Sequence, residues 1–583
     1  MINNKQKIIS LLQFLYGEET GIDTYRSLGK IIRSFQGKIP SQPKRRHLSQ
    51  KDAVLITYGD MLLEEGKLPF KTLCTFLMEY VKGLFNTIHI LPFFPYSSDD
   101  GFSVIDYKEV NRLLGDWKDI EKIRRHFNLM FDLVINHISA KSGWFNKFIK
   151  QESIYQDYFI SVDGDFDFSK VFRPRTNPLL SEVQTQTGKR FVWTTFSSDQ
   201  IDLNFKNPQV LLEIIDVLLF YVIKGANVIR LDAIAYIWKE SGTNCIHLPQ
   251  AHAIVQLMRA VLDEVAPHVM LITETNVPHQ ENISYFGDGN NEAQMVYNFS
   301  LPPLVLHAFQ TQNANYLTQW AQQLTYPSED TTFFNFLASH DGIGVTPAKG
   351  ILADSTIYEM AKRVERLGGR VSYKTNEDGS SSPYELNINY LDALADPSAK
   401  EESISFIAKR FITSQAIMLA LKGVPGIYFH SLVGSRSWLA GVEQTGQNRT
   451  INRQKIQWAV LRNNLQDQNS LQSQVYKMYK HLLVVRAKQA AFHPNARQKV
   501  LDLHPGIFAL LRASEQPAQQ LLCLQNVTEK NVVVNIDLNH LEIEKEQYLF
   551  DIINDGFSIP LQSNVCQITL NPYQVLWLEI RPL

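Results

Sequence analysis

Short apolar runs alternate with longer amphipathic stretches between Val54 and about residue 485. Within each run the apolar residues are adjacent, which is typical of strands that are buried on both faces. The stretches between the runs have apolar positions at helical spacing, and strands that alternate with helices form parallel β/α units. Seven or eight such units predict an α/β fold, a closed (β/α)8 TIM barrel with insertions. The predicted strands are Val54–Thr57, Thr87–Leu91, Leu129–Ile135, Asn227–Leu231, Val269–Thr273, Phe334–Ala338 and Gly426–Phe429.

Two departures from this pattern predict further domains. The long interval after Asn136-His137 contains a predicted hairpin that leads to Trp193, so we expect a small subdomain, residues 139–204, inserted after the third strand. From about Val500, short strands with alternating apolar and polar positions predict a carboxyl-terminal antiparallel β-domain, residues 491–583. The catalytic barrel is then assigned to residues 51–138 and 205–490.

Two polar segments are harder to place. Residues 1–50 are predicted to be a helical lead packed on the barrel, because Ile8, Leu11, Leu12 and Leu15 recur at helical spacing. The basic stretch Lys44-Arg45-Arg46 is expected to be a solvated surface. The segment Gly368–Leu391, rich in Gly and Ser, is predicted to be a long loop, either disordered or a functional lid.

Composition narrows the class of protein. The chain has 583 residues, 44% hydrophobic and 20% charged, which is typical of a globular protein with two or more domains. A net charge of -2 gives no indication of a nucleic-acid or membrane-surface partner. The 4 cysteines have no CxxC spacing, so free thiols and a cytoplasmic location are expected. The acidic segment Asp163–Asp167 lacks the spacing of a calcium loop, and no metal or cofactor is expected.

Carboxylates follow three of the predicted strands: Asp232, Glu274 and Asp341. Because barrel enzymes place their chemistry at the carboxyl ends of the strands, we expect these acids to converge on one site. They can supply a nucleophile, a proton donor and a charge stabiliser for retaining glycosyl transfer. Arg230 lies on the same side of its strand as Asp232 and can keep that carboxylate ionised. Retention predicts that the Asp232 and Glu274 carboxyl groups lie about 5–5.5 Å apart.

The motifs around these acids resemble the signature regions of glycoside hydrolase family 13, the α-amylase superfamily. The resemblance implies that Asp232 is the nucleophile, Glu274 the general acid/base and Asp341 the transition-state stabiliser. It also implies glucose binding by a set of residues that includes His137, Arg230 and His340. The matching segments are Asp132–His137, Arg230–Ala233, Glu274, His340-Asp341 and Gln200–Asn204.

A narrower resemblance is to the sucrose-phosphorylase subfamily. It is carried by Leu91–Phe102, Leu301–Ala308, His340–Val345 and Asn448–Arg453. It implies that Asp99 binds a distal glucose hydroxyl, that Phe102 stacks on the sugar ring and that Arg449 pairs with Asp99. A pocket closed in this way accepts a single glucosyl unit.

The same subfamily has a phosphate-binding segment that Arg173-Pro174-Arg175 resembles, with Arg175 favoured over Arg173. The resemblance implies that phosphate is a co-substrate. A phosphate dianion that approaches the carboxylate of Glu274 requires a cation beside it. A structural surface pair is the alternative reading of the two arginines.

The predicted acceptor loop, Pro383–Tyr390, departs from sucrose phosphorylase. Leu386 replaces a tyrosine of that enzyme, and Asn387 replaces a glutamine that would contact the substrate. The sequence is more similar to the branch that contains glucosylglycerate phosphorylase. Arg370 and Lys374 could meet a glycerate carboxylate or be exposed to solvent.

The sequence therefore predicts a retaining α-glucoside phosphorylase that converts a small glucoside, best matched by 2-O-α-glucosylglycerate, into α-glucose 1-phosphate and the free acceptor. Sucrose, sucrose 6-phosphate and glucosylglycerol are alternative substrates. A family 13 hydrolase or transglucosylase that does not use phosphate is a second hypothesis. A carbohydrate-binding relative without activity is a third, which the presence of all three acids disfavours.

Overall fold

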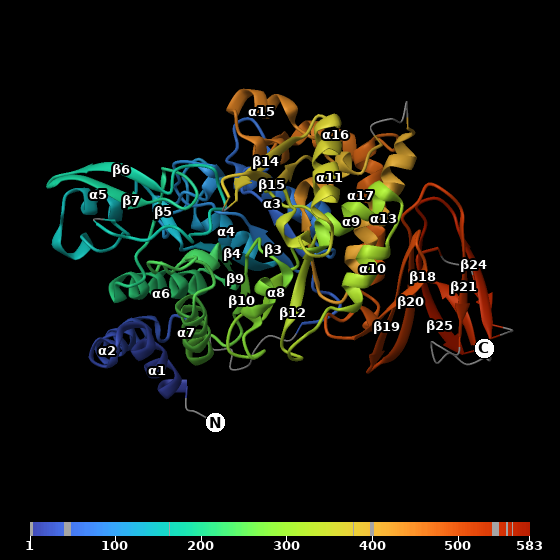
Figure 1. Ribbon diagram of the computed structural model, residues 1–583. Coiled ribbons are helices and arrows are strands. Elements are labelled where there is room, and N and C mark those ends of the chain that lie inside the picture. Colours follow the sequence, from blue (N-terminus) through green and yellow to red (C-terminus); the bar gives the residue numbers. More distant parts are fainter. Residues whose placement is uncertain are drawn as a thin grey trace.

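The computed structural model describes residues 4–39, 48–162, 164–376, 378–396, 402–538, 547–554, 558–561 and 564–582. Its centre is a closed barrel of parallel strands (Figure 1), which confirms the predicted fold class. In order around the barrel the strands are β1 (Val54–Thr57), β16 (Val424–Tyr428), β12 (Thr332–Phe336), β11 (Met295–Tyr297), β10 (Met270–Thr273), β9 (Ala226–Asp232), β4 (Asn128–Val134) and β3 (Thr87–Ile90). The basic stretch Lys44-Arg45-Arg46 and Asp163 lie outside the described residues.

Strand β11 is the barrel strand that the sequence pattern does not reveal. It is only 3 residues long, Met295–Tyr297, and polar residues flank it. Its register is fixed by both neighbours, since Met295 pairs with Ile272 of β10 and with Thr332 of β12. A run this short is identified by its pairing, because periodicity needs more residues to be measurable.

Helices surround the barrel. Several begin at residues that favour helix starts: Asn207 caps α6 and Pro208 follows it, while Asp116 and Asp119 form a capping box at α4. The helices that follow the barrel strands include α3 (Pro69–Phe76), α4 (Trp117–Arg124), α6 (Pro208–Ile223), α7 (Pro249–Val265), α9 (Leu301–Thr311), α13 (Ile404–Ala420), α16 (Trp458–Gln466) and α17 (Leu471–Arg486). Shorter helices and strands are α8 (His279–Ile283), α10 (Asn315–Gln322), α11 (Asp354–Arg366), α12 (Tyr390–Ala393), α14 (Phe429–Leu432), α15 (Leu439–Thr445), β2 (Leu62–Leu63) and β17 (Ile456–Gln457).

The amino-terminal helices α1 (Asn4–Tyr16) and α2 (Glu18–Phe35) lie against the outer helices α6 and α7 (Figure 1). Ile8, Leu12 and Leu15 are buried, and the Asn4 side chain donates a hydrogen bond to the Ala260 carbonyl of α7 (2.9 Å). Among the described residues, no helix is both long enough and apolar enough to cross a membrane.

The inserted segment leaves and rejoins the barrel beside the site. Strand β5 (His137–Ser139) pairs with β8 (Gln200–Asp202), so the start and end of the insertion are joined at its base. Beyond them lie α5 (Gly143–Ile149) and the hairpin of β6 (Leu180–Thr185) and β7 (Gly188–Trp193), which project to one side of the barrel (Figure 1).

The segment predicted as a long loop is instead a β-hairpin. Strands β14 (Arg370–Thr375) and β15 (Ser381–Asn387) pair with each other, and β15 also pairs with β13 (Ile343–Gly344), in the loop that follows β12. The Gly- and Ser-containing turn between β14 and β15 dominates the local composition and hides the strands. The loop prediction was therefore wrong, and the hairpin brings β15 beside Asp341.

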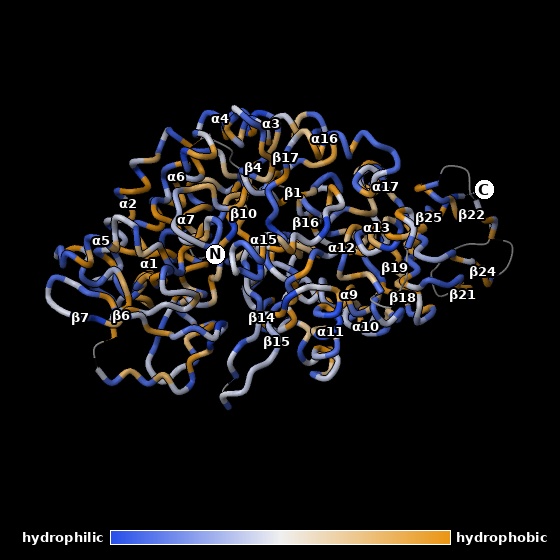
Figure 2. The backbone as a smooth tube through the Cα atoms, turned by 90° about the horizontal axis from the view of Figure 1, so that it is seen from above, coloured by the Kyte–Doolittle hydropathy of each residue, from blue (hydrophilic) through white to orange (hydrophobic). Residues whose placement is uncertain are grey.

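The carboxyl-terminal domain is antiparallel, as predicted. Apolar side chains that alternate along its strands form a second core, and Figure 2 shows this part of the chain at one end of the molecule. Thr413 of α13 donates to the Tyr573 carbonyl (2.6 Å), which ties the domain to the barrel. The strands are β18 (Arg497–His504), β19 (Ile507–Glu515), β20 (Ala518–Asn526), β25 (Val575–Pro582), β22 (Gln547–Asp551) and β23 (Ser558–Pro560) in one sheet, and β21 (Val532–Asp537) with β24 (Val565–Leu570) in another.

Candidate active site

A cavity of about 830 Å³ opens at the carboxyl ends of the barrel strands. Its walls come from the strand-end loops, the inserted subdomain and the hairpin of β14 and β15. Most of the residues predicted from the sequence line it: Asp99, Phe102, His137, Arg175, Asp232, Glu274, His340, Asp341 and Arg449. Arg230, Arg173 and Asn387 are not among its lining residues.

Arg230 contacts both Asp232 and Glu274. Its Nη1 donates to Asp232 Oδ1 (2.7 Å), and its Nη2 lies 3.7 Å from Glu274 Oε2. The guanidinium is buried and lies over the ring of Tyr297, which the short strand β11 supplies. Arg230 is therefore a buried support that holds both carboxylates at the cavity floor.

The proton distribution follows from these contacts. Burial raises the pKa of Glu274 to about 7; Arg230 opposes this rise, and the charges of Asp232 and Asp341 add to it. Burial also raises the pKa of Asp232, against the effect of Arg230. Because Arg230 hydrogen-bonds Asp232 directly but is farther from Glu274, the charge is best stabilised on Asp232. This arrangement favours an ionised Asp232 beside a Glu274 that can carry a proton near neutral pH.

The residue after Asp232 has an unusual backbone conformation. Ala233 has φ 49°, in the left-handed region that residues with a side chain seldom adopt. In this conformation its N–H donates to Glu274 Oε2 (3.2 Å). Strand β9 thus ends at Asp232, and the backbone N–H of the next residue, Ala233, orients Glu274.

A second layer of charge supports Arg230. Asp132, buried on β4, accepts a hydrogen bond from Arg230 and contacts Nε2 of His89 (2.6 Å). Burial acts to raise the pKa of Asp132, but His89 and Arg230 together hold it below its usual value. Asp132 therefore anchors the arginine from outside the cavity.

Asp341 also lines the cavity and has cationic side chains around it. Arg449 Nη1 is 2.7 Å from Asp341 Oδ1, and His340 Nε2 is 3.4 Å from Oδ2. Burial opposes ionisation, but Arg449, His340 and Arg453 hold the pKa of Asp341 well below its usual value. The imidazole of His340 stacks on Phe102 at 4.6 Å, and burial lowers its pKa to about 3. Asp341 is therefore ionised and His340 neutral near pH 7.

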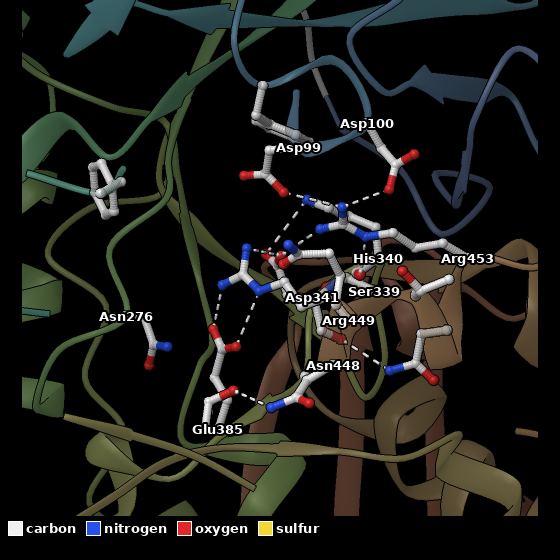
Figure 3. Close-up of a pocket in the computed structure, with 18 of the residues that line it drawn as sticks. Asp99, Asp100, Asn276, Ser339, His340, Asp341, Glu385, Asn448, Arg449 and Arg453 are labelled. Atoms are coloured by element: carbon white, nitrogen blue, oxygen red, sulfur yellow. Dashed lines mark hydrogen bonds and ion pairs between the residues drawn. The ribbon is translucent and has the colours of Figure 1, made fainter. Parts of the chain in front are cut away.

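Asp99 and Asp100, which line the cavity, form ion pairs that differ from the predicted one. Arg453 Nη1 donates to Asp99 Oδ1 (3.1 Å) and Asp100 Oδ2 (2.8 Å), and its Nη2 lies 3.4 Å from Asp341 (Figure 3). Asp99 and Asp100 have φ values of 53° and 47°, so a left-handed turn presents both carboxylates. The expected pairing of Asp99 with Arg449 was wrong. Arg453, four positions later in the same motif, occupies that place.

Arg449 instead bridges Asp341 and Glu385, a residue that the sequence pattern did not single out. Its Nε donates to Glu385 Oε2 (3.1 Å) and its Nη2 to Oε1, so the contact is bidentate (Figure 3). Glu385 is 2% exposed and reaches this position because Gly344 of β13 pairs with it on β15. Without the strand pairing, nothing in the sequence connects Glu385 with Asp341.

The two candidate phosphate-binding arginines differ in position. Arg175 lines the cavity and lies over the rings of Phe196 (5.9 Å) and Tyr384 (5.2 Å). Arg173 donates to the Asn177 carbonyl and is not among the residues around the cavity. Of the two, Arg175 has the geometry of a ligand-binding group.

The acceptor-loop residues are placed differently from the expectation. Tyr384 and Glu385 line the cavity, whereas Leu386 is buried in the core. Asn387 is buried outside the lining and donates to Oγ of the lining residue Ser372 (2.9 Å). Asn387, which the sequence suggested as a substrate-binding residue, therefore does not line the cavity.

Arg370 and Lys374 are also absent from the described lining. Arg370 is exposed and donates to the carbonyls of Gly368 and Gly369. In the described part of the chain, no group of three or more His, Cys, Asp or Glu side chains is arranged to hold a metal ion.

The chain is similar to known proteins in its catalytic domain, over its full length and in its fold. Residues 75–349 match the alpha-amylase catalytic domain. The chain is 49% identical to glucosylglycerate phosphorylase of Spirochaeta thermophila, with 97% of each chain covered. It is 44% identical to glucosylglycerate phosphorylase of Escherichia coli, over 99% of this chain and 100% of that one. The crystal structure of sucrose 6F-phosphate phosphorylase from Thermoanaerobacter thermosaccharolyticum has the same fold, with a TM-score of 0.70 and 24% identity over 84% of this chain and 96% of that chain.

Proposed function

Because the chain belongs to the glucosylglycerate phosphorylase family of α-amylase-type enzymes, we propose that it catalyses the reversible phosphorolysis of 2-O-α-glucosylglycerate. The products are α-glucose 1-phosphate and glycerate, formed with retention through a glucosyl-enzyme. The observation that carries the proposal is the arrangement of Asp232 and Glu274 on Arg230 at the floor of a cavity that Arg175 also lines.

In the first step, the Asp232 carboxylate attacks the anomeric carbon and the bond to the glycerate oxygen breaks. Glu274 gives its proton to that oxygen, so glycerate leaves with its hydroxyl restored. A pKa of about 7 for Glu274 leaves a substantial protonated fraction at neutral pH. Asp341, held ionised by Arg449, would stabilise the positive charge that develops on the ring.

In the second step, an oxygen of phosphate attacks the anomeric carbon from the face that glycerate left. The bond to Asp232 breaks, its carboxylate is restored, and the proton of the attacking oxygen passes to Glu274. Retention follows from two displacements at the same carbon. Arg175 would hold the incoming phosphate while Glu274 is negatively charged.

The closed end of the cavity supports a single glucosyl unit as the donor. Arg453 donates hydrogen bonds to Asp99 and Asp100. These carboxylates can also accept hydrogen bonds from a distal hydroxyl of the glucosyl unit. Phe102 would stack on the sugar ring, while His137 and His340 would donate or accept at its hydroxyls. A closed end of this kind disfavours polymeric substrates.

One experiment tests the reaction. The protein is incubated with glucosylglycerate with and without phosphate, and glucose 1-phosphate and glucose are measured. Phosphate-dependent glucose 1-phosphate is expected; glucose alone would point to the hydrolase hypothesis. In the reverse direction, phosphate release from glucose 1-phosphate is compared for glycerate, glycerol, fructose and fructose 6-phosphate. Rapid release with fructose alone would overturn the choice of acceptor.

The protein is further proposed to act in the cytoplasm. All four cysteines, Cys74, Cys245, Cys523 and Cys566, are free thiols, as expected in a reducing compartment.

A further inference from the structure

Among the cations that line the cavity, Arg175 is distinguished by its partners. Arg449 and Arg453 donate hydrogen bonds to carboxylates, and Lys455 lies 2.7 Å from Asp60. The nearest carboxylate oxygen to Arg175 is Glu385 Oε1 at 3.9 Å, beyond hydrogen-bond distance. In the part of the chain that the structure describes, no hydrogen bond from the Arg175 guanidinium is found, so its donors are available to a ligand.

The surroundings of Arg175 hold it in place without occupying its donors. Phe196 and Tyr384 contact the guanidinium through their rings, an interaction that leaves the N–H groups at its edge unused. Glu385 is already engaged by the bidentate contact with Arg449. Arg175 is therefore fixed beside the cavity as a cation with open hydrogen-bonding capacity.

We propose that Arg175 is a shared anion site, which binds phosphate in one half-reaction and the carboxylate of glycerate, free or within glucosylglycerate, in the other. This inference rests on the proposed phosphorylase function and adds to it the group that recognises the acceptor.

The chemistry of the two anions favours one site. Both attack the same anomeric carbon from the same face, so their attacking oxygens occupy one position in turn. In phosphate the charged oxygens share the phosphorus atom with the attacking oxygen. In glycerate the carboxylate is bonded to the carbon that carries the attacking hydroxyl. In each case the negative charge lies a few bonds from the reacting oxygen, within reach of one planar guanidinium.

Other cations offer no equal alternative for the carboxylate. Arg449 would have to give up Asp341 or Glu385, and Arg453 would have to give up the pair that closes the far end. Arg370 and Lys374, which the sequence suggested for this role, do not line the described cavity. Tyr384, whose ring lies 5.2 Å from the guanidinium carbon of Arg175, lines the same cavity as the catalytic acid Glu274.

The test uses α-glucosyl fluoride as the donor. Asp232 attacks its anomeric carbon and fluoride leaves, so the Asp232 ester forms without any anionic acceptor. The ester then partitions among water, phosphate, glycerate and glycerol, the uncharged analogue of glycerate. With each alcohol, the hydroxyl oxygen bonds to the anomeric carbon, Asp232 leaves as carboxylate and the proton passes to Glu274. The variants are Arg175→Gln, Arg175→Lys and, as a control in the same segment, the exposed Lys170→Gln.

For Arg175→Gln, transfer to both phosphate and glycerate is expected to fall about tenfold to a hundredfold relative to water, as for a lost charge-assisted hydrogen bond. Transfer to glycerol should stay within about twofold of the wild-type ratio. Arg175→Lys should recover part of both anion reactions, and Lys170→Gln should resemble the wild type. Fluoride release by each variant confirms that the fold and the first step are intact.

Loss of phosphate transfer with normal glycerate transfer would overturn the shared site while leaving the proposed function standing. An equal fall for glycerol and glycerate would also overturn it, because the effect would not depend on charge. If the wild-type protein transferred glucose to neither anion, the proposed function itself would fail.

Discussion

The two ends of the cavity satisfy their charges in different ways. At the donor end, Arg453 contacts Asp99, Asp100 and Asp341, so its cation is surrounded by carboxylates. At the acceptor end, Arg175 has two aromatic rings and a distant carboxylate. The difference matches the ligands, because a glucosyl unit is neutral whereas glycerate and phosphate are anions. Ion pairs whose charges are balanced can hydrogen-bond the neutral hydroxyl groups of glucose. A cation without a hydrogen-bonded carboxylate can bind a charged acceptor.

The largest effect is expected at Asp232, which the donor and the acceptor ends of the cavity share as the proposed nucleophile. Replacing Asp232 with Asn removes the nucleophile while preserving its shape, so both directions of the reaction should lose activity on the order of 10⁴-fold. Glucose 1-phosphate formation and glycerate-dependent phosphate release measure the loss, and thermal unfolding checks the fold. Substantial activity with either anion would refute the role of Asp232.

The donor end can be broken at Arg453. Arg453→Met leaves three carboxylates without their shared cation, and breaking a buried ion pair costs about 3–5 kcal/mol. The low end of that range is expected, because the side chains of Asp99 and Asp100 are 33% and 36% exposed. Urea unfolding measures the cost. The matched control Arg462→Met removes an exposed pair with Glu79 and should change stability by less than about 1 kcal/mol. Equal losses would remove the basis for calling the donor end a closed network.

The pH dependence sharpens the comparison at the proton donor. Because Glu274 has a raised pKa of about 7 and must be protonated to release glycerate, kcat/KM for glucosylglycerate should fall as pH rises through 7. Well above that pH the fall approaches about tenfold per unit. With α-glucosyl fluoride, whose leaving group needs less protonation, the fall of kcat/KM above pH 7 should be much shallower. A flat profile with glucosylglycerate between pH 6 and 9 would contradict the assignment.

The smallest effect is expected at the edge of the acceptor end. Arg370 is exposed and bonded to nearby carbonyls of its own chain segment. Arg370→Ala should therefore change KM for glycerate by less than about twofold, in the range of ordinary surface substitutions. A tenfold increase in KM would show that this arginine, which starts the hairpin, reaches the acceptor.

The barrel and its central acids could be predicted because their signals are local. Asp232, Glu274 and Asp341 each follow an apolar run that is long enough to be seen as a strand. Strand β11 has too few residues for such a signal, and its identity depends on pairing with β10 and β12. Sequence periodicity therefore recovers the architecture but misses an element that the neighbouring strands define.

The charge network could not be predicted because it depends on contacts between distant segments. Arg449 and Arg453 belong to one short motif, and only the path of the chain decides which of them faces Asp99. Glu385 lies within β15, and β13, α11 and β14 separate it from Asp341 along the chain. Its role becomes visible when β13 and β15 pair, a register that local composition does not encode.

The same pairing has a consequence for how substrate preference can change. The hairpin forms its own hydrogen-bond ladder. It meets the rest of the site through the strand pairs Ile343–Leu386 and Gly344–Glu385, the contact of Glu385 with Arg449 and the contact of Tyr384 with Arg175. The hairpin of β14 and β15 is thus a unit that can be exchanged between related enzymes while these contacts are kept. Selection, natural or in the laboratory, can then diversify the acceptor without disturbing the barrel strands that carry the reaction.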